Sequence, residues 1–129
     1  MKKYRFIKPY LDDGKTNLRE TIEKSGVYLI HKKGDVKPVY VGMSGTNLYK
    51  TILRHFQSWE DKQTRVTYPK QGYLVRVVTC TPLQAAKLER ALIVKYKPKD
   101  NPNKYDNYML DLTDKKAIQV YEDKDIVPF

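Results

Sequence analysis

Residues 26–42 read GVYLIHKKGDVKPVYVG, and this stretch decides the fold that the sequence predicts. Val27–His31 is a run rich in β-branched and apolar residues, which favours a strand. Lys32–Asp35 contains a glycine and predicts a turn, and Pro38–Val41 predicts a second strand. Two short strands joined through such a loop indicate a β-hairpin. Gly42–Thr46 is expected to be a flexible exit from it.

Helices are predicted on both sides of this hairpin. Before it, Asn17 is expected to cap a short helix over Leu18–Lys24. After it, a helix from about Leu48 to Glu60 places its apolar residues on one face, with Thr46 or Asn47 as its cap.

Two further strands are predicted in the second half of the chain. Residues 61–70 are polar and indicate a loop, in which residues 66–68 could form a short edge. Tyr73–Cys80 is apolar and β-branched, as is typical of a central strand, and Ala117–Tyr121 is expected to be the last strand. The predicted class is α+β, with a small three-stranded antiparallel sheet flanked by helices.

The helix between these two strands has a clear start. Residues 81–84 (TPLQ) combine a Thr cap, Pro at the first helical position and Gln three residues after the cap. The helix is expected to run to about Tyr96, because Pro98 prevents its continuation.

Glu89 in this helix is a carboxylate within an apolar stripe. The residues three and four positions away are Ala85, Ala86, Leu92 and Ile93. Burial of a carboxylate costs free energy unless the carboxylate is paired. Charged residues at such unfavourable positions concentrate at functional sites. Two interpretations follow: a salt bridge to a nearby Lys or Arg, or a metal ligand at the floor of a cleft.

The composition fits one domain with a cationic surface. The chain has 129 residues, 40% of them hydrophobic, and no apolar run long enough to span a membrane. Cys80 is its single cysteine, and no secretory signal is evident, so a cytoplasmic location is expected. We expect a nuclease-like unit over residues 25–102, with extensions at 1–24 and 103–129, the latter packing on the same domain.

The formal net charge of +10 is the strongest compositional feature. A small domain this basic attracts polyanions, of which nucleic acid is the commonest partner. A cationic surface that serves only solubility is the alternative. Eleven tyrosines supply rings that could stack on bases or fill the core.

Gly26-Val27-Tyr28 and Tyr40-Val41-Gly42, separated by eleven residues, resemble the two-part signature of the GIY-YIG nuclease family. The order of the later features is also similar: a helix with Arg54, a helix with Glu89, and Asn101 shortly after a proline. The resemblance covers about residues 25–102 and implies a divalent-metal-dependent DNA endonuclease.

One spacing departs from the family pattern. In many members the catalytic Arg stands four residues before a His or Tyr on the same helix, whereas Arg54 and His55 are adjacent here. Matching His55 to that position puts the Arg position on Thr51. If Arg54 is instead matched to the catalytic Arg, the position of the His or Tyr falls on Ser58. We expect Arg54 to reach the phosphate from one turn later.

The resemblance also implies roles for these residues. Glu89 would bind Mg²⁺ or Mn²⁺, which prefer oxygen ligands, and Arg54 would bind the phosphate. Tyr28 or Tyr40 would take or relay the proton of the attacking water, and His55 is a second candidate base. The substrate-binding candidates are Gly42, Lys50 and Asn101, the last of which could instead support the site by hydrogen bonds.

Three functions are therefore weighed. The first is an active DNA endonuclease. The second is a catalytically weak or inactive nucleic-acid-binding module on the same scaffold, which the unusual position of Arg54 favours. The third, a protein-interaction domain, would leave Glu89 unexplained. DNA is the expected partner, no membrane is expected, and a homodimer is left open.

Overall fold

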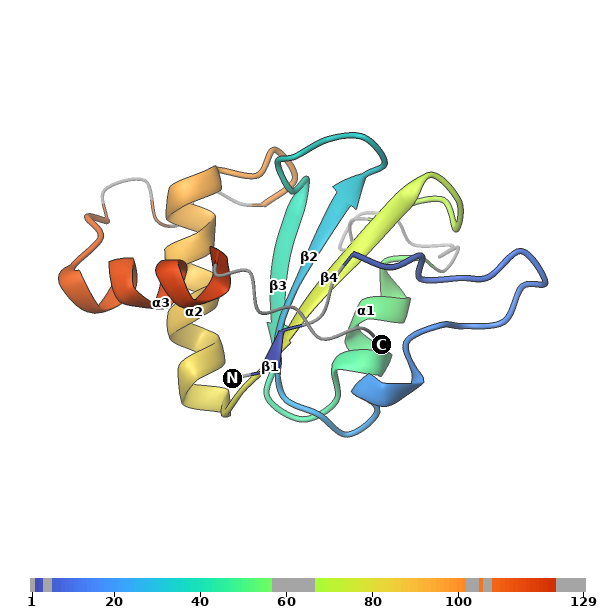
Figure 1. Cartoon of the computed structure of the whole chain (residues 1–129), viewed down its shortest axis with the longest axis horizontal. Coiled ribbons are helices and arrows are strands. Elements are labelled where there is room, and N and C mark those ends of the chain that lie inside the picture. Colours follow the sequence, from blue (N-terminus) through green and yellow to red (C-terminus); the bar gives the residue numbers. More distant parts are fainter. Residues whose placement is uncertain (1, 4–5, 57–66, 102–104, 106–107, 123–129) are drawn as a thin grey trace.

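The computed structural model describes residues 2–3, 6–56, 67–101, 105 and 108–122. In this part of the chain, three strands of five or more residues form an antiparallel sheet with helices on both faces, which confirms the predicted α+β class (Figure 1). The elements are β1 (Lys2–Lys3), the 3-10 helix η1 (Arg19–Thr21), β2 (Gly26–Lys32), β3 (Tyr40–Ser44), α1 (Leu48–Arg54), β4 (Tyr73–Thr79), α2 (Pro82–Tyr96) and α3 (Leu112–Glu122).

The sheet has the order β1-β4-β2-β3, with antiparallel neighbours throughout. The predicted hairpin is confirmed, because β2 and β3 pair from Ile30–Tyr40 to Gly26–Ser44. The flexible exit predicted at Gly42–Thr46 is wrong for its first three residues. They continue the ladder with β2, so that β3 ends only at Ser44.

The strand predicted at Tyr73–Cys80 is confirmed as β4, which pairs along the whole of β2. The two-residue β1 pairs with the far edge of β4. Of the short edge considered at residues 66–68, residue 66 lies outside the described part, and residues 67 and 68 form no strand.

Alternation along the strands divides the core into two layers. Tyr28 and Ile30 point to the face that α1 covers, whereas Val27 and Leu29 point to the face that α2 and α3 cover (Figure 1). This follows from the two-residue period of a strand. Leu18, in the N-terminal extension, is fully buried in the α1 layer.

The two helices predicted around the hairpin are shorter in the described residues than expected. The first is only the 3-10 turn η1, which follows Leu18 and has no side-chain cap, so the predicted cap at Asn17 is wrong. The second, α1, begins after Asn47, whose side chain accepts a hydrogen bond from the Lys50 backbone. It ends at Arg54, and residues 57–60 of the predicted span lie outside the described part.

The helix α2 matches its prediction at both ends. The Thr81 and Gln84 side chains form a reciprocal capping box, and Pro82 occupies the first turn. At the other end Lys97 takes a left-handed conformation (φ 46°) before Pro98. Local signals fix both ends of this helix.

The strand predicted at Ala117–Tyr121 is wrong, since these residues belong to α3. Asp111 and Asp114 cap the start of α3 reciprocally: each side chain accepts a hydrogen bond from the other residue's backbone N–H, at 2.8 and 3.1 Å. Asp114, Ile118 and Tyr121 are then buried at helical spacing. The cap and the three-to-four-residue period outweigh the β-branched composition.

Candidate active site

The candidate site lies at β3, the edge strand of the sheet. Tyr28 on β2 pairs with Gly42 on β3, and Tyr40 precedes Gly42 by two residues on the same face. His55 follows the last residue of α1, which packs on β2 and β3. The sequence separates these residues by up to 27 positions, and the fold brings them together.

The Tyr28 side chain is 2% exposed and lies across Gly42. A Cβ atom at Gly42 would overlap the Cζ atom and the hydroxyl oxygen of Tyr28. Gly42 is therefore required here because the tyrosine ring occupies the space of a side chain. This gives the glycine of the second motif a physical role in placing the Tyr28 hydroxyl.

The Tyr28 hydroxyl meets the ring of His55. Its oxygen lies 2.8 Å from His55 Nε2, which is a hydrogen-bond distance. Tyr40 packs against the same histidine, with ring centroids 4.6 Å apart, and it stacks on Tyr28 at 6.2 Å. Three candidate proton-transfer residues therefore form one cluster, in which Tyr40 and His55 are only partly buried.

Burial raises the pKa of Tyr28 well above its ordinary value of 10, and the charges of Tyr40 and Glu89 and a hydrogen bond with Tyr40 raise it further. At neutral pH the Tyr28 phenol is therefore protonated. A phenol in this state can take up a proton only while it passes its own proton on, and His55 Nε2 is positioned to accept it.

Glu89 lies on α2, which packs on β2 and β3. It is close enough for its negative charge to act on Tyr28. Ala85, Leu92 and Ile93 around it are buried as expected, but Ala86 is exposed. Glu89 is partly buried, so it lies at the border of the buried face of α2 and not at its centre.

The metal ligand expected from the sequence is the Glu89 carboxylate on α2. Among the described residues, no group of three His, Cys, Asp or Glu side chains could hold a metal. Mg²⁺ keeps several of its waters and can be bound through a single carboxylate. Glu89 fits a cation of that kind, and Mn²⁺ takes the same oxygen ligands.

Asn101 holds the backbone of β3. Its Oδ1 accepts from the Val41 N–H and its Nδ2 donates to the Val41 carbonyl, both at 2.8 Å. Val41 lies between Tyr40 and Gly42, so this side chain fixes the strand at the position of the site. Of the two roles considered for Asn101, this geometry favours support of the site over contact with DNA.

Two residues that the sequence analysis did not single out extend this support. The Tyr68 hydroxyl donates to Asp100 Oδ2 at 2.8 Å, and the Asp100 N–H donates to the Val39 carbonyl at 3.1 Å. The Tyr68 backbone N–H also donates to the His55 carbonyl at 2.6 Å. These contacts join segments that are distant in sequence, so no local sequence pattern predicts them.

The remaining candidates lie on α1. Arg54 is its last residue and is partly buried, immediately before His55. Lys50 is exposed in the first turn, with its backbone N–H bonded to the Asn47 cap. Thr51, on which the Arg position falls if His55 is matched to the His of the signature, donates its hydroxyl to the Asn47 carbonyl at 3.1 Å.

Fold and site together define a small α+β domain with a tyrosine–histidine cluster formed by β2, β3 and the end of α1, and with a glutamate on α2, the helix that packs on β2 and β3. Over 80 residues, 61% of its length, the chain is 40% identical to UvrABC system protein C of Aquifex aeolicus (strain VF5). The chain spans 14% of the length of that relative. No protein-family model matches the chain, and no solved structure matches it. None of the described helices is long and apolar enough to cross a membrane.

Proposed function

We propose that this protein is a divalent-metal-dependent DNA endonuclease, with its catalytic unit within residues 25–102. The observation that carries the proposal is the Tyr28–His55 hydrogen bond of 2.8 Å within reach of the Glu89 charge. The similarity to UvrABC system protein C supports a DNA-processing role of nuclease type. The net charge of +10 supports a polyanionic substrate.

In the proposed reaction a water molecule attacks the phosphorus atom of the scissile phosphodiester. As the new P–O bond forms, the water gives a proton to the Tyr28 oxygen, and the Tyr28 hydroxyl proton passes to His55 Nε2. The bond to the leaving oxygen breaks, and that oxygen takes up a proton from solvent. Tyr40 is the less buried of the two tyrosines and would orient the water at the entrance of the cluster.

The charged residues would stabilise the phosphate. Glu89 would hold Mg²⁺ or Mn²⁺, which stabilises charge on the phosphate and the leaving oxygen when bound. A cation at Glu89 would also offset the negative charge that raises the pKa of Tyr28. Arg54 offers a planar fork of donors for phosphate oxygens. Lys50 would bind the DNA backbone, and Asn101 would keep β3 in place.

A catalytically weak nucleic-acid-binding module is the second candidate. The observation that favours it concerns Thr51, on which the Arg position falls if His55 is matched to the family's His, because its hydroxyl is bonded to the Asn47 carbonyl. Nicking of supercoiled plasmid by the purified chain, with Mg²⁺ and with a chelator, separates the two candidates. Endonuclease activity predicts nicked circles only with the metal. Salt-sensitive DNA binding without nicking would support the binding module.

A further inference from the structure

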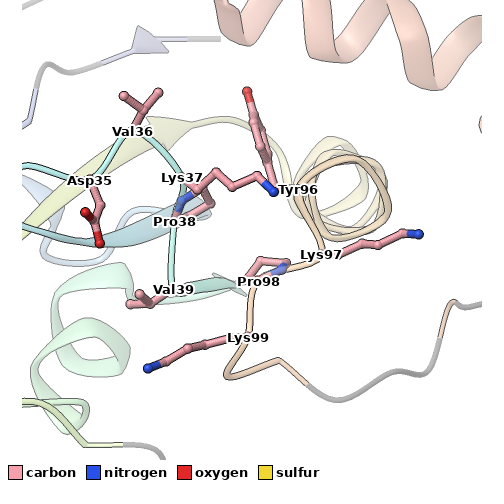
Figure 2. Close-up of a pocket in the computed structure, with 9 residues that line it drawn as sticks. All are labelled: Asp35, Val36, Lys37, Pro38, Val39, Tyr96, Lys97, Pro98 and Lys99. Carbon is pink, nitrogen blue, oxygen red and sulfur yellow. The ribbon is translucent and has the colours of Figure 1, made fainter.

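An open groove of about 510 Å³ lies beside the candidate site, between the β2–β3 loop and the end of α2 (Figure 2). One wall is residues 35–39, and the other is residues 96–99. Neither wall belongs to the tyrosine–histidine cluster. The first wall leads directly to the cluster, because Val39 precedes Tyr40, and the second leads to Asp100 and Asn101, which bond to the backbone of Val39 and Val41.

The groove has an excess of positive charge. Its lining includes Lys37, Lys97 and Lys99, all exposed, against the single carboxylate of Asp35. In Figure 2 the Lys37 side chain extends over the groove toward Tyr96, and the Lys99 side chain extends past Val39. The Lys97 side chain points away on the opposite side. Lys37 and Lys99 are therefore the lysines whose ammonium groups are available to a ligand in this groove.

Hydrogen bonds hold the two walls at a fixed position relative to the site. The Asp100 N–H donates to the Val39 carbonyl at 3.1 Å, and Asn101 bonds to both backbone groups of Val41. A ligand bound in the groove would therefore lie at a fixed position relative to Tyr40, which follows Val39 in the chain. Consecutive nucleotides of one strand advance by about 3.4 Å along the helix axis. The nucleotides that would lie in the groove are therefore those next to the scissile bond.

We propose that this groove binds the phosphate backbone of the DNA strand next to the cleaved bond, through the ammonium groups of Lys37 and Lys99. The inference rests on the proposed function and adds to it the path of the substrate. Asp35 and the carbonyl end of the α2 dipole oppose an anion here. The two lysines outnumber that carboxylate, and flexible ammonium groups bind phosphate as point charges.

The test compares two double variants that each remove two positive charges. Lys37→Gln with Lys99→Gln removes the groove cations, and Lys115→Gln with Lys116→Gln removes two exposed lysines of α3, which lie outside the groove lining. The affinity for a DNA duplex is measured between low and physiological salt. The groove variant should bind roughly tenfold or more weakly, with a slope of log K against log salt reduced by about 2. The control should change far less.

Single-turnover cleavage at saturating DNA should stay within about twofold of wild type in the control variant, because its two lysines lie on α3, outside the groove and the tyrosine–histidine cluster. Equal losses of affinity in the two double variants would overturn the groove proposal while leaving the endonuclease intact. Absence of salt-dependent DNA binding by the wild-type chain would overturn the proposed function and the groove with it.

Discussion

The Tyr28 hydroxyl and His55 Nε2 lie 2.8 Å apart, and Tyr28 reaches that position only because Gly42 leaves room for its ring. One motif of the hairpin therefore supplies the phenol and the other supplies the space. Buried and protonated, the phenol is unsuited to act alone as a base. Its contact with an imidazole turns it into a link along which a proton can move.

Tyr28→Phe should remove this link and keep the ring over Gly42. We expect the single-turnover cleavage rate to fall by about 10²–10⁴, the range for loss of a positioned proton-transfer group. The free energy of unfolding should fall by only about 1 kcal/mol, for one lost hydrogen bond. Tyr49→Phe is the matched control, because its hydroxyl bonds to Thr16 at 2.7 Å on the same side of the sheet. Equal rates for the two variants would remove Tyr28 from the mechanism.

Gly42→Ala should destabilise the fold, because the new Cβ would overlap the Tyr28 ring. Overpacking of this kind costs about 1–3 kcal/mol, which urea unfolding would measure. Gly45→Ala should stay within about 0.5 kcal/mol of wild type, since a Cβ there would approach only Pro82, at 3.6 Å. Indistinguishable unfolding midpoints for the two variants would show that Tyr28 does not depend on Gly42.

Asn101→Ala should loosen β3, because it removes both hydrogen bonds to the Val41 backbone. We expect a loss of about 1–3 kcal/mol in stability and faster hydrogen exchange at the Val41 amide. Asn101→Asp should also destabilise, since its second oxygen would face the Val41 carbonyl. Asn17→Ala, outside the sheet, is the control. Unchanged exchange at Val41 in Asn101→Ala would argue against the supporting role.

Arg54→Ala decides between the two alignments of α1. If Arg54 binds the phosphate, its loss should slow single-turnover cleavage by about 10²–10³ and weaken DNA binding much less. Arg54→Lys should also be slow, because an ammonium cannot reproduce the bidentate fork. Thr51→Ala should change little. Unaltered cleavage by Arg54→Ala would leave the family's Arg position vacant and favour the binding module.

The parts of the fold that the sequence predicted correctly are those with local signals. The glycine-containing loop specified the hairpin, and Thr81 and Gln84 specified the start of α2. The same kind of signal lies at Asp111 and Asp114, and it starts the helix that contains Ala117–Tyr121 despite the β-branched composition of this run. Propensity in a five-residue run is a weaker guide than a reciprocal cap.

The candidate site was predictable in its membership and not in its contacts. Resemblance to a family selected Tyr28 and Tyr40, and the apolar surroundings of Glu89 in the sequence selected that residue, but the hydrogen bond to His55 joins residues 27 positions apart. The Asn101–Val41 bonds span 60 positions. Such contacts depend on how α1 and α2 pack on the sheet, which no local pattern contains.

The most direct test of the central claim is the Mg²⁺-dependent cleavage rate of Glu89→Gln. The amide is nearly isosteric with the carboxylate but binds a cation poorly, so the fold should persist while the rate falls by at least about 100-fold. Glu20→Gln, an exposed carboxylate on η1, should cleave at the wild-type rate. Wild-type cleavage by Glu89→Gln in Mg²⁺, with unchanged unfolding, would contradict the proposed metal site.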